Sequence, residues 1–370
     1  MKLYSSFESA LTQADYQLDA STGIWSRPGF QGINYSDGYK VERHIEDVIN
    51  STSDLTVFSA ELRSHYTDWA STYHLSSTRA NILRPFQLTE NQDILEIGAG
   101  CGALTRYLGE CGANVLALEV SLRRSKIARA RTHDLPNVAV LAEALLEFKS
   151  EQKFDVITLI GVLEYAGLYL ASDKPAETML AKAVSFLKPS GVVIIAIENQ
   201  LGLKYFAGAP EDHVQVPMYG LEGRYRKNQP QTYGRQILST ILTSSGLTNM
   251  SFLAPFPDYK LPISIITENG LTKQGFDAAA FALQSTTRDP QLPQIMGFSP
   301  ELVWPQIFSN KLGLDLSNSF LVVASAETEE LLDKSLLACH YSTNRVSKYA
   351  KETMFIGDQD GEISVNYRML

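Results

Sequence analysis

Three glycines spaced two residues apart, with an acid just before them, are the residues of this chain best suited to chemistry. The run Asp93-Ile94-Leu95-Glu96-Ile97-Gly98-Ala99-Gly100-Cys101-Gly102 leads from an apolar stretch into a glycine turn, and a helical pattern begins at Ala103. Glycine permits a positive φ and lets a ligand approach the backbone without a Cβ in the way. The start of the next helix adds unpaired N–H groups and a partial positive charge. Together these features predict a cofactor-binding turn between a strand and a helix.

Two classes of cofactor use such a turn, and the acids near it distinguish them. Gly98, Gly100 and Ala103 satisfy the looser G-x-G-x-x-A pattern of dinucleotide binding. Glu96 would face a pyrophosphate unfavourably, but it suits a cationic ligand such as the amino group of S-adenosylmethionine, held directly or through water. Glu119, at the end of the next predicted strand, can accept both ribose hydroxyls in either class. The acids therefore favour S-adenosylmethionine, and an NAD(P)-dependent oxidoreductase remains the alternative.

The ends of two later strands complete the predicted cofactor pocket. Glu143 follows the third strand, where it could accept a hydrogen bond from the adenine amino group. The fourth strand runs into Gly161-Val162-Leu163-Glu164-Tyr165, which we expect to line the floor beside the reactive methyl group.

The elements that must position these residues alternate between strands and helices. Strands are expected at 93–97, 114–119, 137–141, 154–160 and 191–197, and helices at 102–110, 122–131 and 176–187. Unbroken apolar strands are typical of parallel sheets covered by helices on both faces. The alternation predicts a doubly wound, Rossmann-like α/β sheet.

The segments around this sheet define the predicted domains. Residues 1–88 are expected to form a helical cap, in which Val41, Ile45, Val48 and Ile49 share one helix face. After the sheet we expect a loop at 200–233, a helix at 234–245 and strands at 248–254 and 320–324, with an insertion of short helices at about 256–318. The core domain is predicted at 89–330, and residues 331–370 form an extension with a β-hairpin within 350–370.

In this combination and order, the chain resembles the class I S-adenosylmethionine-dependent methyltransferases over about residues 90–255 and again at 320–325. Leu187-Lys188-Pro189 belongs to the same pattern, while Ser190 departs from it, because the family usually has a second glycine there. The resemblance implies S-adenosylmethionine as cofactor. No metal ligands are assigned, and whether a metal assists stays open. It assigns the cofactor contacts to Glu96, Gly98, Ala99, Gly100, Cys101, Gly102, Glu119, Val120, Glu143, Ala144 and Gly161.

A narrower resemblance begins at the fifth strand. The run Ala196-Ile197-Glu198-Asn199-Gln200-Leu201-Gly202-Leu203-Lys204-Tyr205-Phe206-Ala207-Gly208-Ala209-Pro210-Glu211-Asp212-His213 is similar to methyltransferases of bacterial cell-surface polysaccharide (lipopolysaccharide and O-antigen) synthesis. Residues 69–79, 255–262 and 318–320 fit the same group, some of whose members are joined to glycosyltransferase or kinase-like domains. This resemblance implies a sugar or glycan acceptor and suggests such a module as a partner.

The loop after the fifth strand is predicted to carry the acceptor site. Methyl transfer is an in-line displacement that depends on near-attack geometry, and a sugar hydroxyl must lose its proton as the bond forms. His213 is the best candidate base, because an unperturbed imidazole titrates near neutral pH. Asp212 precedes it, and Glu198 could orient it or serve as the base itself. Aromatic faces suit sugar rings and arginine suits phosphate or carboxylate, so acceptor contacts are expected from Glu164, Tyr165, Asn199, Tyr205, Tyr219 and Arg224.

Composition narrows the classes of function. The chain has 370 residues and a formal net charge of -9, without a long basic run, which argues against a nucleic-acid partner. No apolar stretch is long enough to span a membrane, and the N-terminus lacks a signal core. Three cysteines without metal-ligand spacing are interpreted as free thiols of a cytoplasmic protein.

The sequence therefore predicts a methyltransferase that O-methylates a sugar or glycan intermediate. N-methylation of an amino sugar and methylation of a small metabolite stay open. So does a methyltransferase fold that serves a glycosyltransferase as a scaffold without turnover.

Overall fold

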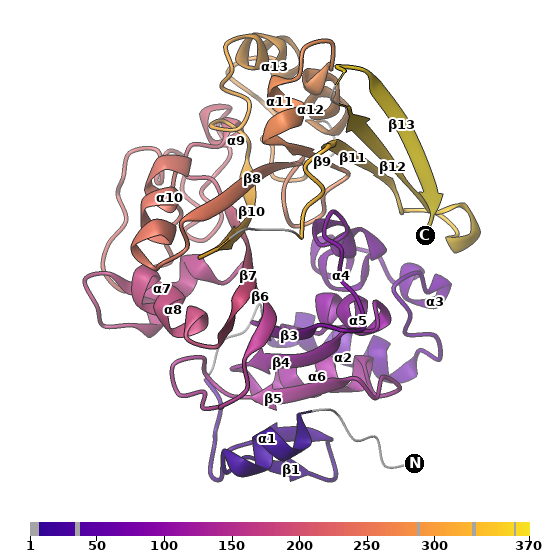
Figure 1. Cartoon of the computed structure of the whole chain (residues 1–370), viewed down its shortest axis with the longest axis vertical. Coiled ribbons are helices and arrows are strands. Elements are labelled where there is room, and N and C mark those ends of the chain that lie inside the picture. Colours follow the sequence, from indigo (N-terminus) through magenta and orange to yellow (C-terminus); the bar gives the residue numbers. More distant parts are fainter. Residues whose placement is uncertain (1–6, 34–37, 287–288, 328–330, 359) are drawn as a thin grey trace. The chain divides into compact units, whose positions relative to one another are not determined.

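The computed structural model describes residues 7–33, 38–286, 289–327, 331–358 and 360–370 (Figure 1). These residues form two compact units. The first comprises the described residues up to Ala80 together with Gln87–Ile160 and Lys182–Val193. The second comprises Asn81–Phe86, Gly161–Ala181 and the described residues from Ile194 onward. Strand β7 (Leu187–Glu198) begins in the first unit and ends in the second.

The first unit contains the predicted doubly wound sheet. Its strand order is β1-β2-β5-β4-β3-β6-β7, with β1 Gln17–Asp19, β2 Ile24–Ser26, β3 Asp93–Ile97, β4 Asn114–Glu119, β5 Val138–Ala142 and β6 Phe154–Ile160. Strand β3 pairs in parallel with both β4 and β6, and β4 pairs in parallel with β5. Helices α5 (Ala103–Glu110) and α6 (Leu122–Arg131) connect β3 to β4 and β4 to β5. This is the α/β architecture expected for these residues.

The N-terminal segment was predicted to be a helical cap. It is not wholly helical, because it also contributes two strands to this sheet. Strand β2 pairs in parallel with β5, and β1 pairs antiparallel with β2. Each strand has three residues, too few for an alternating pattern to identify it in the sequence. The helices of the segment are α1 Glu8–Gln13, α2 Tyr39–Ser51, α3 Ala60–Arg63, α4 Trp69–Leu75 and the 3₁₀ helix η1 Ser77–Ile82.

Three of the four residues predicted to share one face of the first long helix are buried. Ile45, Val48 and Ile49 of α2 are buried and pack in one cluster with Ile127 of α6 and with Cys101. Spacings of three and four residues bring side chains to one side of a helix, which is why this face was predictable.

The second unit continues from β7 through an antiparallel arrangement. Its strand order is β7-β10-β8-β9-β11-β12-β13, with β8 Asn249–Phe256, β9 Ser264–Thr267, β10 Ser319–Ser325, β11 Leu336–Ser342, β12 Lys351–Gly357 and β13 Ile363–Met369. Strand β8 pairs antiparallel with β10 and β9, and β11 pairs antiparallel with β9 and β12. The predicted C-terminal hairpin is formed by β12 and β13.

Helices and short turns complete the second unit. The helical elements are η2 Leu163–Tyr165, α7 Ala166–Tyr169, α9 Leu203–Phe206, α10 Arg235–Ser244, α11 Glu268–Thr272, α12 Ala278–Thr286, α13 Pro300–Ser309 and η3 Ser347–Tyr349, and α8 (Pro175–Val184) leads back toward β7. The predicted insertion therefore carries strand β9 besides its helices. Strand β11 adds residues 336–342 to the same sheet. The two compact units therefore do not divide at 88/89 and 330/331, the domain boundaries expected from the sequence.

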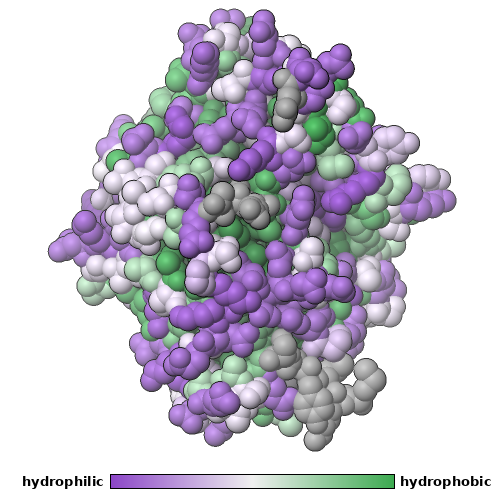
Figure 2. All heavy atoms as spheres, in the orientation of Figure 1, coloured by the Kyte–Doolittle hydropathy of each residue, from purple (hydrophilic) through white to green (hydrophobic). Residues whose placement is uncertain are grey.

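The face shown in Figure 2 is mostly hydrophilic, with apolar residues distributed among the polar ones. Among the helices of the described residues, none combines the length and the apolar character needed to cross a membrane.

Candidate active site

The glycine turn lies at the carboxyl end of β3, where the first helix of the doubly wound sheet begins. Gly98, Gly100 and Gly102 have φ values of 79°, 54° and 79°, which side chains with a Cβ rarely adopt. A Cβ on Gly100 would meet no described atom within 4 Å, whereas one on Gly102 would lie 2.8 Å from the Cα of Ala128. Gly102 is thus required for close packing against α6, and Gly100 leaves an open stretch of backbone.

Glu119 is tied directly to that open stretch. Its Oε2 accepts a hydrogen bond from the Gly100 N–H at 2.7 Å, and its Oε1 accepts one from the Ser121 N–H at 2.9 Å. The carboxyl is buried, and this burial raises its pKa. Because a carboxylate has about four acceptor positions, Glu119 retains the capacity to accept ribose hydroxyls.

Glu96 is the second buried acid of the turn, and the residue is only 3% exposed. Its Oε2 accepts a hydrogen bond from the Thr105 hydroxyl at 2.6 Å. Burial, with a smaller contribution from the charge of Glu119, raises the pKa of Glu96 to about 7. A buried acid in this state gains from a cationic partner, as expected for the amino group of the cofactor.

The other predicted cofactor residues of the first unit contribute in different ways. Glu143 Oε1 accepts a hydrogen bond from the Ala144 N–H at 2.8 Å, and its Oε2 lies 3.1 Å from Nε of Arg27. Cys101 packs in the α2–α6 cluster, so its backbone is the part that remains for a cofactor. The Val120 carbonyl accepts a hydrogen bond from the Ile33 N–H at 3.1 Å.

A second group of functional side chains lies in the second unit. Glu164 follows β6 in η2, Glu198 is the last residue of β7, and His213 belongs to the loop that follows. One possible ligand atom from each lies within 4.8 Å of the other two. Glu164 and Glu198 are each 1% exposed, and the Oε2 atoms of both have no hydrogen-bond partner among the described residues. We call these three residues the Glu-Glu-His cluster.

His213 is held in place by two neighbours. Its Nδ1 lies 3.0 Å from Oε1 of Glu211, whose Oε2 accepts hydrogen bonds from the N–H groups of His213 and Val214. The Tyr165 ring meets the imidazole edge-on, with centroids 5.2 Å apart. The contact with Glu211 leaves Nε2 as the ring nitrogen available for a further partner.

Without a bound ligand, two members of the Glu-Glu-His cluster, His213 and Glu164, hold their protons at neutral pH. Burial opposes a charged imidazole, but the carboxylates of Glu198, Glu211 and Glu164 outweigh it and raise the pKa of His213 to about 9. Burial, followed by the charge of Glu198, raises the pKa of Glu164 to about 8. The imidazole of His213 is therefore protonated on both ring nitrogens at neutral pH and cannot accept a proton from the acceptor.

Asp212 is engaged in a neighbouring ion network. Its Oδ1 lies 2.8 Å from Nζ of Lys260, its Oδ2 lies 3.1 Å from Nζ of Lys204, and the Tyr205 hydroxyl donates to Oδ2. Burial works against ionisation, but the two ammonium groups outweigh it and hold the pKa of Asp212 well below its usual range. A carboxylate so stabilised is a weak base.

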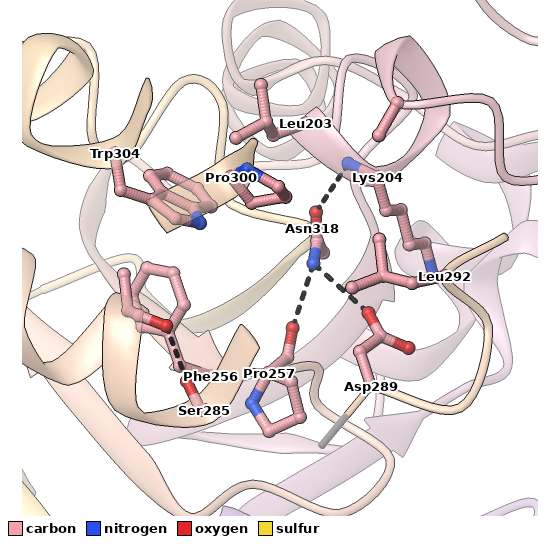
Figure 3. Close-up of a pocket in the computed structure, with 12 residues that line it drawn as sticks. Leu203, Lys204, Phe256, Pro257, Ser285, Asp289, Leu292, Pro300, Trp304 and Asn318 are labelled. Atoms are coloured by element: carbon pink, nitrogen blue, oxygen red, sulfur yellow. Dashed lines mark hydrogen bonds between the residues drawn. The ribbon is translucent and has the colours of Figure 1, made fainter. Parts of the chain in front are cut away.

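Lys204 occupies its place in this network because the backbone around it is fixed. Asn318 accepts a hydrogen bond from the Lys204 N–H at 3.0 Å and donates one to the Pro257 carbonyl at 3.0 Å (Figure 3). The next residue, Asp258, places Oδ2 at 3.1 Å from Nζ of Lys204. Lys204, Pro257 and Asn318 line a small cavity of about 20 Å³ (Figure 3), so the cavity is bordered by a lysine that is ion-paired with Asp258.

The remaining predicted acceptor residues have diverse surroundings. The Asn199 side chain donates to the carbonyls of Asp315 and Ser317 and so fixes the loop. Arg224 lies 5.0 Å from the centre of the Tyr219 ring, and the two form a separate pair. The structure thus brings Glu164, Tyr165, Glu198 and His213 together, while it gives Asn199 a structural role.

Sequence reasoning missed one member of the site, Lys260, which follows Tyr259 in the run 255–262 that fits the narrower resemblance. The Tyr259 hydroxyl donates to Glu198 Oε1 at 3.3 Å, and Nζ of Lys260 also contacts this oxygen. A Cβ on Gly161 would lie 2.8 Å from the Tyr259 hydroxyl oxygen, so this predicted cofactor residue also packs against the site. The available signal was the pair of charged residues, Asp258 and Lys260, in the otherwise uncharged run Pro255-Phe256-Pro257-Asp258-Tyr259-Lys260-Leu261-Pro262.

Comparisons with known proteins point to one class. Residues 95–193 match the family described as "Methyltransferase domain". The chain is 25% identical over 138 residues to a ubiquinone biosynthesis O-methyltransferase of Hydrogenovibrio crunogenus, covering 36% of this chain and 54% of that protein. It is 31% identical over 146 residues to an uncharacterized methyltransferase of Alkaliphilus oremlandii, covering 40% and 62% respectively. The chain thus spans less than two thirds of the length of either relative.

A comparison of structures returns similar proteins at low identity. A phosphoethanolamine N-methyltransferase of Haemonchus contortus, solved with S-adenosylhomocysteine, aligns over 74% of this chain and 60% of its own with a TM-score of 0.42 and 16% identity.

The strand order of the first unit, the glycine turn after β3 and the matched residues 95–193 define a class I methyltransferase fold. S-adenosylmethionine is the cofactor of this fold. The open backbone at Gly100 and the buried acids Glu96 and Glu119 fit its amino acid and ribose parts.

Proposed function

We propose that this chain transfers the methyl group of S-adenosylmethionine to a hydroxyl group of a sugar or glycan intermediate in bacterial cell-surface polysaccharide synthesis. The observation that carries the methyl-transfer proposal is the open turn at Gly100, whose N–H is bonded to the buried Glu119. The saccharide acceptor is supported by the resemblance of residues 196–213 and by the aromatic and charged loop that follows β7.

In the proposed complex, each acid of the first unit binds a different part of the cofactor. Glu96 would hold the amino group, Glu119 the ribose hydroxyls and Glu143 the adenine amino group. The bound cofactor supplies an electrophilic methyl group on sulfur. The protein has to orient the acceptor oxygen and remove its proton.

The Glu-Glu-His cluster is the proposed place for the acceptor hydroxyl. It lies at the carboxyl ends of β6 and β7, the edge at which open α/β sheets bind ligands. Of the three predicted bases, Glu198 fits best, because its buried Oε2 has no partner among the described residues. His213 already carries a proton, and both oxygens of Asp212 are engaged.

Cofactor binding can be tested with a matched pair of glycine variants. Gly100→Val and Gly246→Val both place a β-branched residue at positive φ, where no described atom lies within 4 Å of the new Cβ. The backbone strain is similar, about 1–3 kcal/mol each, but only Gly100 belongs to the turn. Calorimetry with S-adenosylhomocysteine should show binding to the wild type and to Gly246→Val, and none to Gly100→Val. Equal affinity in both variants, or binding of NADH alone, would overturn the cofactor assignment.

The acceptor can be tested with cofactor labelled in its methyl group. Lipid-linked saccharides and nucleotide sugars should take up the label as methyl ethers, and Glu198→Gln should abolish uptake while it retains affinity for S-adenosylhomocysteine. Label that enters only quinol, protein or amine acceptors would refute the saccharide proposal and leave methyl transfer intact.

A further inference from the structure

Two buried carboxylates and an imidazole converge from three separate segments of the second unit. Glu164 comes from η2, Glu198 from the end of β7 and His213 from the following loop. We infer that the Glu-Glu-His cluster is a binding site for one first-row divalent metal ion. The inference concerns binding of the ion and holds whether or not the proposed methyl transfer is confirmed.

The spacing of the three groups suits a single ion. Their candidate ligand atoms lie within 4.8 Å of one another. Bonds of about 2.0–2.2 Å to nitrogen and carboxylate oxygen place neighbouring ligands of one ion about 3.0–3.6 Å apart. Side-chain rotations would therefore have to bring the candidate ligand atoms from within 4.8 Å to this separation around the ion.

Both carboxylates present an oxygen that the protein itself does not use. Oε2 of Glu164 and Oε2 of Glu198 are buried and have no hydrogen-bond partner among the described residues. A buried polar atom without a partner costs about 1–3 kcal/mol. Such a cost, present twice in one cluster, is explained if a ligand satisfies both atoms.

The surrounding residues orient the proposed ligands. The Tyr259 hydroxyl and the Lys260 ammonium group both bind Oε1 of Glu198 and so direct its Oε2 toward the cluster. Glu211 contacts Nδ1 of His213 at 3.0 Å, so Nε2 remains to bind the ion once the imidazole has released its second proton to solvent. A carboxylate on the far nitrogen of a ligating histidine is the usual outer support of a metal site.

The local charge also favours a cation, although an ammonium group is close. Lys260 is shared, since its Nζ also lies 2.8 Å from Asp212 and 3.8 Å from Asp258. In this part of the structure the acidic side chains outnumber the cationic ones. The acids are Glu164, Glu198, Glu211, Asp212 and Asp258, and the cations are the ammonium groups of Lys204 and Lys260 and the protonated imidazole of His213. The ion would replace the protons that Glu164 and His213 hold.

The donor set indicates which ions fit. Carboxylates suit Mg²⁺, Ca²⁺ and Mn²⁺, and imidazole suits Zn²⁺ and Fe²⁺. A mixed set of two oxygens and one nitrogen favours a first-row ion over Mg²⁺ or Ca²⁺, which prefer oxygen alone. With the ion bound, Glu198 would be a ligand, and an acceptor hydroxyl on the ion would lose its proton more easily.

Mn²⁺ is a suitable probe because its free and bound forms are distinguished by electron paramagnetic resonance. Untagged full-length protein, stripped with a chelator, is titrated with MnCl₂ in the absence of cofactor and acceptor. We expect one bound ion per chain, with nitrogen modulation from imidazole in the pulsed spectrum. Glu164→Gln should weaken binding by about tenfold or more, and His213→Ala should abolish the nitrogen modulation.

A buried glutamate outside the cluster provides the matched control. Glu352 is also 1% exposed and pairs with Arg368 at 2.6 Å in the β12–β13 hairpin. Glu352→Gln should bind Mn²⁺ as tightly as the wild type, and thermal melts establish that each variant is folded. No binding of Mn²⁺ or Zn²⁺ by the wild type would overturn the inference. So would equal binding by folded Glu164→Gln, or nitrogen modulation that persists in His213→Ala.

Discussion

Replacing Lys204 with methionine should destabilise the second unit strongly, because it leaves two buried carboxylates without their shared cation. The Lys204 side chain is 0% exposed, and its Nζ lies 3.1 Å from oxygens of both Asp212 and Asp258. At that distance and an effective dielectric of about 20, each pair contributes about 5 kcal/mol of attraction. Desolvation of the ammonium group offsets several kcal/mol of this gain.

The expected net loss in the free energy of unfolding is at the lower end of the range for breaking a buried ion pair. Removing one partner typically costs about 3–5 kcal/mol, and Lys260 still faces Asp212 at 2.8 Å in the variant. We therefore expect a loss of about 3 kcal/mol in the free energy of unfolding. For a unit of this size, that corresponds to a fall in melting temperature of about 6–12 °C.

Calorimetric melts of three variants test this reasoning. Lys227→Met is the matched control, because Lys227 pairs with Asp173 on the surface, where the two side chains are 85% and 88% exposed, and its loss should leave the melting temperature unchanged. Lys204→Met/Asp258→Asn should recover part of the stability by removing one stranded charge. A melting temperature of Lys204→Met close to that of the wild type would refute the argument. So would a double variant no more stable than the single one.

Two further predictions concern pH. The pKa of His213 in the folded protein, about 9, lies above the ordinary histidine value of about 6.5, so its stabilising contribution is complete below about pH 6.5 and is lost as the pH rises through about 9. In chelated buffer, the difference in free energy of unfolding between the wild type and His213→Gln should shrink across this window, and a constant difference would contradict the assigned charge. Because the pKa of Glu96 is about 7, its ionised form increases from pH 6 to 8, and the affinity for S-adenosylhomocysteine should rise with it. Thr105→Val removes a hydrogen bond that lowers this pKa, so calorimetry should place its rise in affinity at higher pH; affinity independent of pH would show that Glu96 does not bind the amino group.

The central strands were predictable because their sequence signal is local. β3, β4 and β6 have the bounds expected from their unbroken apolar runs, and burial on both faces makes such runs unmistakable. Strands β1, β2 and β9 were missed, because segments of three or four residues pair only when a neighbouring strand offers its edge. For these, the partner rather than the propensity decides.

By itself, the sequence determined the cofactor turn. Gly98, Gly100 and Gly102 follow a buried strand, and their positive φ values are consequences of residues close together in the chain. The backbone demands at such a turn are local, and glycine is the residue that meets them.

Only the tertiary structure decided what surrounds the acceptor loop. Glu164, Glu198, His213 and Lys260 lie far apart in sequence, and each alone is compatible with a solvated charge. Their burial in one cluster brings two unpartnered carboxylate oxygens together and keeps His213 protonated. A pKa and a ligand set depend on distances and desolvation, which are properties of the folded chain and not of any one segment.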